Sequence, residues 1–288
     1  MSAGVRNALV VGGGISGMAA AISLQDRGVA VDLIEVDPEW RVVGAGITIT
    51  GPTLRAFRGL NILEAVREKG FFSTEVKFFE ADGAFIRAME SPVLEAGIPA
   101  SGGILRPDLH RILSDRTLQG GADVRLGVKL QQFTQDDSGV VATTSDGKER
   151  RYDVLVGADG SSSELRQQLF ADGPSLSFVG QGCWRMLAAR PDTVTGPEIY
   201  FGENNIKVGL NPCSPQHMYI FATIAMPGNP RILDEELPDR MREILGQFGG
   251  HMGMARDSIG PDSSINYRPL HAMLKQPPWH VGRVGLIG

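Results

Sequence analysis

The first forty residues carry the clearest pattern of apolar and polar positions in the chain. Residues 7–11 (NALVV) are a short apolar run, which is typical of a strand buried on both faces. Over residues 15–22 the apolar positions recur every three or four residues, as on one face of a helix. Residues 29–35 (VAVDLIE) form a second apolar run. The pattern therefore predicts a strand, a helix and a second strand, which together make a βαβ unit.

Helix-like and strand-like patterns continue to alternate up to about residue 174. Helices are predicted over 52–60, 62–68 and 107–119, a hairpin over 77–89, and strands over 123–126, 129–134, 140–144 and 153–157. From about residue 175, short β-type runs dominate, and one helical pattern interrupts them at 241–248. This order predicts an α/β fold with a Rossmann-like dinucleotide-binding domain over residues 1–174 and a second, mostly antiparallel β-sheet domain over residues 175–280.

Two segments are expected to cross this division of the chain. Residues 281–288 (VGRVGLIG) read as another buried strand, and we expect it to return to the first domain. The hairpin at 77–90 lies within the first domain in sequence, and we allow for it joining the sheet of the second.

Three glycines follow the first predicted strand in the spacing G-x-G-x-x-G. Gly12 permits the tight turn, Gly14 lets a pyrophosphate approach the backbone, and Gly17 lets the helix pack closely on the strand. The N–H groups of Ile15 and Ser16, at the start of the helix, would then face the phosphates. The glycine spacing therefore indicates a phosphate-binding turn.

Glu35 ends the second predicted strand. A carboxylate at this point can accept hydrogen bonds from both hydroxyls of an adenosine ribose, and it would repel a 2′-phosphate. A glycine-rich turn in an ordinary α/β domain is the alternative, but it does not explain why three glycines and an acid occur together at these spacings. The pattern predicts dinucleotide binding and leaves NAD and FAD open.

Composition narrows the class of protein without naming a function. A net charge of −5 indicates no general affinity for nucleic acid, and 21% charged with 42% hydrophobic residues is typical of a soluble globular protein. Cys183 and Cys213 suggest no disulfide framework and are interpreted as buried apolar residues. No signal peptide or run of about eighteen apolar residues occurs, so we expect a cytoplasmic protein without a membrane span. The five histidines lack ligand spacing, so no metal site is expected.

A second turn, near the middle of the chain, has the same sequence pattern as the first. Residues 153–160 (DVLVGADG) run from an apolar strand into a turn of small residues that contains Asp159. Asp159 could be a plain turn or cap residue. Its flanking glycines favour a role at a cofactor.

Together these segments resemble the FAD-dependent aromatic hydroxylases of the p-hydroxybenzoate and salicylate hydroxylase type, the class A flavoprotein monooxygenases. The glycine fingerprint with Glu35 matches the first motif of that family, and residues 157–161 (GADGS) with Arg166 match its second, the D-G motif. Residues 283–288 resemble the strand and first glycine of the third, the G-D motif. The Asp-Ala-Ala-His part of that motif would follow residue 288, so we expect this chain to be a fragment cut at the third FAD motif.

Weaker matches extend the resemblance over most of the chain. Arg41 and the pair Gly46-Ile47 resemble the segment that passes beside the flavin in this family. Arg106 resembles the arginine of the R-x-x-L element, which implies contact with the ribityl–phosphate region. Val128 lies where the family places backbone against adenine. For Arg106, a surface ion pair is the alternative.

The resemblance implies a monooxygenase that uses NADH or NADPH and O2 to hydroxylate a small phenolic or heteroaromatic substrate through a flavin C4a-hydroperoxide. It implies tightly bound FAD and a nicotinamide that visits transiently. Thr48 and Thr50 would lie near the flavin if the Gly46 match holds, and Tyr219 and His217 lie two residues apart on one strand face. Thr48, Tyr219 and His217 are the substrate candidates. No residue is identified as the catalytic base.

Two other functions remain open at this point. One is an FAD- or NAD-dependent dehydrogenase that inserts no oxygen. The other is a truncated, non-catalytic dinucleotide-binding protein. A homodimer is compatible with either and with the monooxygenase.

Overall fold

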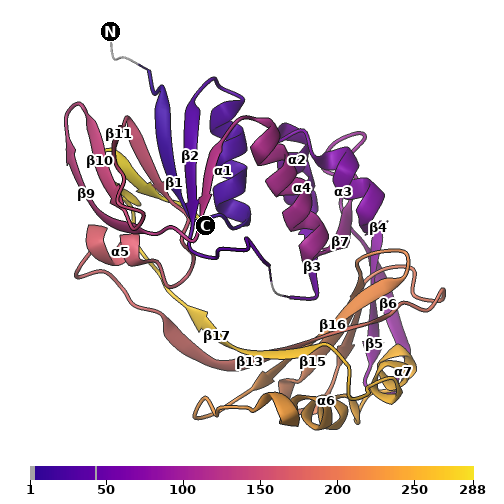
Figure 1. Ribbon diagram of the computed structural model, residues 1–288. Coiled ribbons are helices and arrows are strands. Elements are labelled where there is room, and N and C mark those ends of the chain that lie inside the picture. Colours follow the sequence, from indigo (N-terminus) through magenta and orange to yellow (C-terminus); the bar gives the residue numbers. More distant parts are fainter. Residues whose placement is uncertain (1–3, 43) are drawn as a thin grey trace. The chain divides into compact units, whose positions relative to one another are not determined.

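The computed structural model describes residues 4–42 and 44–288, except for the side chain of residue 205. The chain divides into two compact units (Figure 1). Unit 1 contains residues 1–42, 110–176 and 273–288, and unit 2 contains residues 43–109 and 177–272. Residues 43–109 thus group with the second unit, whereas the sequence pattern assigned them to the first domain.

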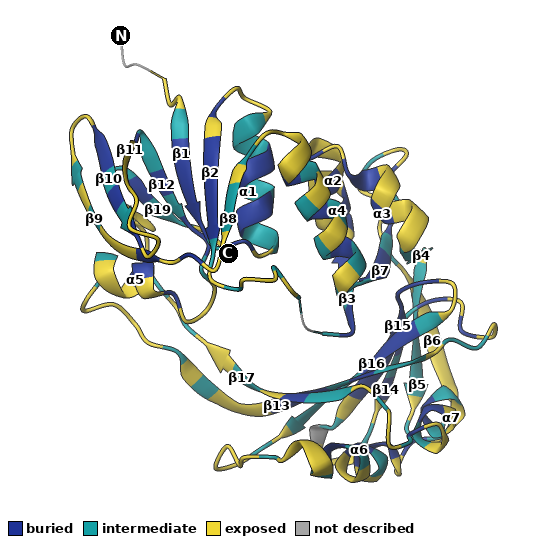
Figure 2. Cartoon of the chain, viewed as in Figure 1, coloured by how far each residue is buried: buried dark blue, intermediate teal, exposed yellow. Residues whose placement is uncertain are grey.

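Unit 1 is built on a six-stranded sheet in the order β18-β19-β12-β1-β2-β8. Its strands are β1 (Asn7–Val11), β2 (Ala30–Glu35), β8 (Asp123–Leu126), β12 (Val154–Gly157), β18 (His280–Val281) and β19 (Val284–Leu286). All neighbours pair in parallel except β18 and β19. Figure 2 shows β1 and β2 largely buried, as their continuous apolar runs require.

The helices of unit 1 connect and cover this sheet. They are α1 (Ile15–Gln25), α5 (Glu164–Leu169) and α4 (Arg106–Gln119), of which the residues from His110 onward belong to unit 1. The buried face of α1 contains Gly17, Met18 and Ile22. Gly28 follows α1 with φ of +78°, the left-handed conformation that reverses the chain into β2.

A small antiparallel sheet completes unit 1. It contains β9 (Leu130–Asp136), β10 (Gly139–Thr144) and β11 (Glu149–Tyr152) in the order β11-β10-β9. Asp32 of β2 is buried, and it accepts hydrogen bonds from the Tyr152 hydroxyl at 2.6 Å and the Arg150 guanidinium at 2.8 Å. These charge-assisted hydrogen bonds tie the small sheet to the large one.

Unit 2 is built on a seven-stranded sheet in the order β17-β13-β16-β15-β14-β5-β6. Its strands are β5 (Glu75–Glu80), β6 (Phe85–Glu90), β13 (Ser177–Ala189), β14 (Glu198–Phe201), β15 (Lys207–Pro212), β16 (His217–Ala225) and β17 (Ile265–Ala272). The pairing is antiparallel throughout, apart from β5 with β14. The predicted α/β fold, with a Rossmann-like unit and a second, mostly antiparallel sheet, is confirmed.

A second, three-stranded sheet explains why residues 43–109 group with unit 2. It has the order β3-β7-β4, with β3 (Gly46–Thr50), β4 (Phe71–Ser73) and β7 (Ser101–Leu105), and it is accompanied by α2 (Gly51–Gly59) and α3 (Leu63–Lys69). The Asn211 amide on β15 donates to the Gly102 carbonyl on β7 at 3.4 Å. The hairpin β5–β6 forms one edge of the large sheet. The Asn211–Gly102 hydrogen bond and the pairing of β5 with β14 connect this segment to the rest of unit 2.

One face of the seven-stranded sheet is covered by a buried apolar core. It includes Trp184, Tyr200, Ile220 and Met241. The elements on this side are the 3-10 turns η1 (Glu203–Asn205) and η2 (Asp234–Glu236) and the helices α6 (Leu237–Leu245) and α7 (Gly250–Asp257). The sequence pattern predicted one helix over 241–248, whereas α6 ends at Leu245 and α7 follows separately. No helix in the described part of the chain is long and apolar enough to cross a membrane.

Candidate functional site

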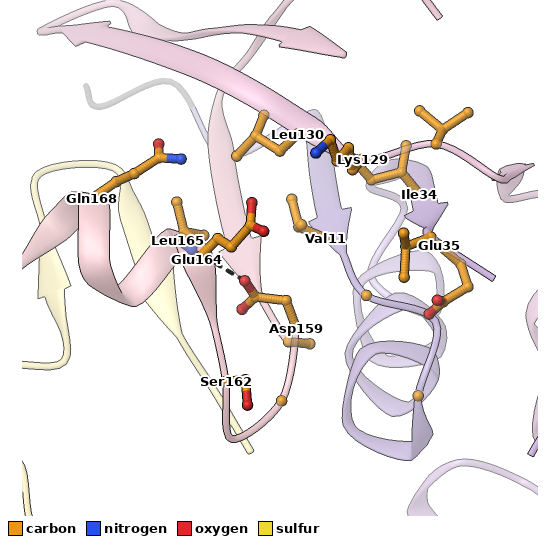
Figure 3. Close-up of a pocket in the computed structure, with 16 residues that line it drawn as sticks. Val11, Ile34, Glu35, Lys129, Leu130, Asp159, Ser162, Glu164, Leu165 and Gln168 are labelled. Atoms are coloured by element: carbon orange, nitrogen blue, oxygen red, sulfur yellow. Dashed lines mark hydrogen bonds between the residues drawn. The ribbon is translucent and has the colours of Figure 1, made fainter. Parts of the chain in front are cut away.

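A pocket of about 400 Å³ lies in unit 1, where β12, β1 and β2 reach their carboxyl ends. Figure 3 shows Glu35 and Asp159 on this pocket, with Val11 of β1 between them. The lining residues are Val11, Gly12, Gly14, Ile34, Glu35, Val36, Val128, Lys129, Leu130, Ala158, Asp159, Gly160, Ser162, Glu164, Leu165 and Gln168. The carboxyl edge of a parallel sheet is where open α/β folds bind ligands. The structure therefore brings the two predicted acid-and-glycine turns into one pocket.

The glycine loop between β1 and α1 has little room for side chains. A Cβ on Gly12, whose φ is +108°, would lie 2.4 Å from the Ala158 carbonyl oxygen, and a Cβ on Gly17 would lie 1.9 Å from the Gly12 oxygen. In contrast, a Cβ on Gly14 would meet no atom within 4 Å. The first and third glycines are therefore required by packing, while Gly14 presents bare backbone to open space.

The start of α1 leaves backbone donors available. Gly14 is the N-cap residue and supplies no side-chain hydrogen bond, and no acidic side chain lies in the first turn. The N–H groups of Ile15, Ser16 and Gly17 belong to the first turn, where helical N–H groups have no partner within the helix. These donors suit an anionic group.

The Glu35 carboxylate already holds the backbone around it. Its Oε2 accepts from the Gly13 N–H at 2.6 Å, and its Oε1 accepts from the Asp37 N–H at 2.8 Å. A carboxylate offers about four acceptor positions, so about two remain on Glu35 for a ligand. The Val128 N–H donates to the Glu35 backbone oxygen at 2.9 Å, which places Val128 on the same pocket.

Asp159 is a hydrogen-bonded turn residue, and it also lines the pocket. Its Oδ2 accepts from the Leu165 N–H at 3.1 Å, beside the start of α5, while Ser163 is the N-cap residue of that helix. The buried Arg166 donates to the Ser161 carbonyl at 2.9 Å and holds the turn closed. The Asp159 carboxylate therefore lines the pocket from a rigid turn.

Arg41 is not among the residues that line this pocket. Its side chain is 63% exposed and pairs with Glu39 at 3.1 Å and Asp37 at 3.6 Å, both on its own segment. Exposed ion pairs of this kind contribute little stability. The ion pairs of Arg41 involve only its own segment, and its cofactor role stays a prediction.

The glycine loop and its flanking carboxylates fit the adenosine and pyrophosphate end of FAD. Gly14 offers open space beside free helix donors, which suits a pyrophosphate. Glu35 retains acceptor positions at the end of β2, where ribose hydroxyls would need them. Apolar Val128 and Leu130 line the same pocket and suit a planar base.

In unit 2, three polar side chains from separate strands converge. Thr48 of β3 and Tyr219 of β16 are joined through their hydroxyl groups, and the Asn211 amide of β15 donates to the Thr48 hydroxyl at 3.0 Å. Tyr219 is 6% exposed, and it packs with Ala45, Leu187 and other apolar residues. Asn211 was not among the sequence candidates, because only the strand register places it opposite Tyr219.

Gly46, Ile47 and Arg106 are the remaining cofactor candidates of unit 2. A Cβ on Gly46 would lie 2.3 Å from the Tyr219 ring, so a glycine is needed there. Ile47, next on β3, is partly exposed. Burial, together with the neighbouring positive charge of Arg185, lowers the pKa of Arg106 from its usual value. The Arg106 guanidinium is therefore a partly buried cation in the same unit as Thr48 and Tyr219.

His217 and the cysteines stand apart from these interactions. The His217 Nδ1 lies 3.2 Å from the Ser214 hydroxyl in the turn between β15 and β16. The structure therefore does not link His217 to Tyr219 or Thr48 by a hydrogen bond.

Both cysteines are buried and free, and burial raises the pKa of Cys213 to about 12. Within residues 4–42 and 44–288, no cluster of His, Cys, Asp or Glu could hold a metal ion.

Comparisons with known proteins agree with this fold and with a flavin-binding family. Residues 6–264 match the family model described as FAD binding domain. The chain is 30% identical over 290 residues to the aurachin C monooxygenase/isomerase of Stigmatella aurantiaca, covering 97% of this chain and 72% of that protein. It is 27% identical over 290 residues to the 2-heptyl-3-hydroxy-4(1H)-quinolone synthase of Pseudomonas aeruginosa (strain UCBPP-PA14), with the same coverage of each chain.

A solved structure shows the same fold. Klebsiella pneumoniae HpxO, complexed with FAD and uric acid, superposes with a TM-score of 0.87 at 21% identity, over 98% of this chain and 72% of that one. The resemblance inferred from the sequence motifs is confirmed. The chain belongs to the FAD binding domain family and, within it, to the flavoprotein monooxygenases.

Proposed function

We propose that this protein uses NADH or NADPH and O2 to hydroxylate a small aromatic or heteroaromatic substrate, with FAD as its tightly bound cofactor. The observation that carries the proposal is the shared pocket of Glu35 and Asp159 beside the glycine loop. When bound, FAD would supply the redox chemistry, taking electrons from the nicotinamide and activating dioxygen. Names of relatives support the substrate class: urate and 3-hydroxybenzoate are substrates in the names of two similar hydroxylases.

Unit 1 is proposed to hold the dinucleotide end of the cofactor. Gly12, Gly14 and the first turn of α1, with Ile15, Ser16 and Gly17, would bind the pyrophosphate through backbone N–H groups. Glu35 would accept hydrogen bonds from the adenosine ribose, and Val128 would lie against the adenine. These groups need no rearrangement of side chains, because the loop is already held in place by Glu35.

Asp159 and Arg106 are proposed to bind the rest of the cofactor. Asp159 lines the pocket with one carboxylate oxygen engaged by the Leu165 N–H, which leaves acceptor capacity for a ligand hydroxyl. Arg106 offers a cation for a phosphate oxygen. Gly46 and Ile47 would pass beside the flavin ring.

Unit 2 is proposed to bind the substrate. A phenolic substrate is most reactive as its phenolate, and a hydrogen bond donated to the substrate oxygen favours that charged form. The Tyr219 and Thr48 hydroxyls share one hydrogen bond, and either oxygen can be the donor. Whichever hydroxyl does not donate within the pair keeps its hydrogen for a substrate oxygen. Asn211 fixes the Thr48 hydroxyl by donating to it.

The test of this proposal begins with the purified 288-residue chain. We expect the FAD-loaded chain to consume NADH or NADPH and O2 in the presence of urate or 3-hydroxybenzoate, and to release a hydroxylated product. Reduction of an added electron acceptor without oxygen in the product would favour the dehydrogenase instead. A folded chain that binds FAD but turns over none of these substrates would favour a non-catalytic binding protein.

A further inference from the structure

The peptide units on either side of Gly13 are held by two side chains from outside the glycine loop. The Gly13 N–H donates to Glu35 Oε2 at 2.6 Å, and the Gly13 carbonyl accepts from the Trp40 indole N–H at 2.8 Å. A residue held at both its donor and its acceptor has little freedom to rotate. The loop between β1 and α1 is therefore fixed by Trp40 as well as by Glu35.

Trp40 is placed for this contact by its own backbone and by one neighbour. Its φ is +49°, an uncommon conformation for a residue with a side chain, and it directs the chain back toward the loop after β2. Its ring meets the edge of the His110 ring at 5.7 Å and 86°. In this conformation the indole N–H donates to the Gly13 carbonyl.

The indole occupies the space that a side chain at position 13 would need. A Cβ on Gly13 would lie 2.5 Å from the Trp40 indole nitrogen and 3.0 Å from the Glu35 Cβ. The spacing G-x-G-x-x-G accepts any residue at this position, so the fingerprint itself does not require a glycine there. In this chain the Trp40 indole nitrogen is the nearest atom to that Cβ, and the Glu35 side chain narrows the space further.

We propose that Trp40 is a positioning residue of the dinucleotide site, which orients the glycine loop by binding Gly13 and thereby restricts position 13 to glycine. The inference rests on the proposed binding of FAD at this loop. The loop is then preorganised, so no free energy of FAD binding is lost on ordering it when the cofactor binds.

A double-mutant cycle tests the coupling. Trp40→Phe keeps an aromatic ring and removes the donor, and we expect it to weaken FAD binding by about fivefold to tenfold. Gly13→Ala should weaken binding at least about tenfold in the wild-type background, because the methyl group displaces the indole. In the Trp40→Ala background, the same Gly13→Ala change should weaken binding by less than about threefold. Equal effects of Gly13→Ala in both backgrounds would overturn the proposal.

Hydrogen exchange in the FAD-free chain provides a readout that does not depend on the cofactor. Trp40→Phe should speed amide exchange over residues 12–18 by about tenfold, while Trp279→Phe, which changes a tryptophan that is 37% exposed, should leave it unchanged. Unchanged exchange in Trp40→Phe would overturn the role of Trp40. If the wild-type chain binds no FAD, the proposed function fails, and this exchange measurement still decides whether Trp40 positions the loop.

Discussion

Thr48 and Tyr219, 171 residues apart in the chain, are joined by a hydrogen bond between their hydroxyl groups. Thr48 is exposed and Tyr219 is buried, so the pair connects the interior of unit 2 to its surface. Asn211 donates to the Thr48 hydroxyl from a third strand. This arrangement is the basis for assigning a substrate-binding role to the two hydroxyls.

Removing either hydroxyl should slow hydroxylation and leave cofactor binding intact. Tyr219→Phe and Thr48→Val are expected to lower the rate of product formation by about tenfold to a hundredfold, because each removes one hydroxyl of the pair proposed to donate a hydrogen bond to the substrate oxygen. The double variant should be little slower than either single one, since both act on one hydrogen bond. The rate of product formation and the affinity for FAD are measured on the same samples.

Thr50→Val is the matched control for this pair. Thr50 lies on the same strand, and its hydroxyl makes only a 3.4 Å contact with Thr53 among the described hydrogen bonds. Removal of the Thr50 hydroxyl should leave the rate of product formation unchanged. A Tyr219→Phe variant with the wild-type rate would remove Tyr219 from the mechanism.

Glu35→Gln should weaken FAD binding. The amide keeps one acceptor but presents an NH2 group to either the Gly13 or the Asp37 N–H, both of which now donate to the carboxylate. Hydrogen bonds to charged groups contribute about 1.5–3 kcal/mol, so a loss of about tenfold to a hundredfold in affinity is expected. Isothermal titration with FAD measures it, and Glu39→Gln, a change in an exposed acid of the same segment, should have no effect.

Stability should decrease as the pH falls through the ordinary titration range of histidine. Burial lowers the pKa of His110, and the nearby Glu35 charge opposes this only in part. The unfolded chain therefore binds a proton at His110 at a higher pH than the folded chain does, which favours unfolding below about pH 6.5. Urea unfolding at about pH 7.5 and about pH 5.5 should show a smaller loss of stability in His110→Gln than in wild type. An identical loss in both proteins would contradict this assignment.

Replacing the buried carboxylate of Glu198 in unit 2 should lower the stability of the protein and leave FAD binding unchanged. Glu198 is 1% exposed and accepts from the Tyr200 hydroxyl at 2.8 Å, and its Oε2 lies 2.9 Å from the His251 Nδ1. Glu198→Gln should lower the free energy of unfolding by about 1–3 kcal/mol, because the amide leaves one of these groups unsatisfied. Glu243→Gln, on the exposed face of α6, is the control.

The part of the site that lies in turns directly after strands could be predicted from the sequence. Glu35 ends β2 and Asp159 lies two residues after the end of β12, and the carboxyl ends of such parallel strands share one edge of the sheet. Gly12 and Gly17 were identified for the reasons that the structure shows, a tight turn and close packing. Trp40 gave no such signal, because its contact depends on a positive φ that no local pattern requires.

The parts that depend on strand register could not be predicted. Asn211 meets Thr48 only because β15 pairs with β16 and because β3 and β7 lie beside β15. The grouping of residues 43–109 with unit 2 has the same origin. The helix α7 was missed because its sequence, GHMGMARD, contains two glycines that disfavour a helix, while burial of Met252 and Ala255 stabilises it.

Titration of the FAD-free chain with FAD tests the central claim most directly. If the pocket of Glu35 and Asp159 holds the cofactor, one FAD should bind per chain with micromolar or tighter affinity, and a combined Glu35→Gln, Asp159→Asn variant with an unchanged circular dichroism spectrum should bind it at least about a hundredfold more weakly. A variant that binds FAD as tightly as the wild type, or a folded wild-type chain that binds none, would contradict the account.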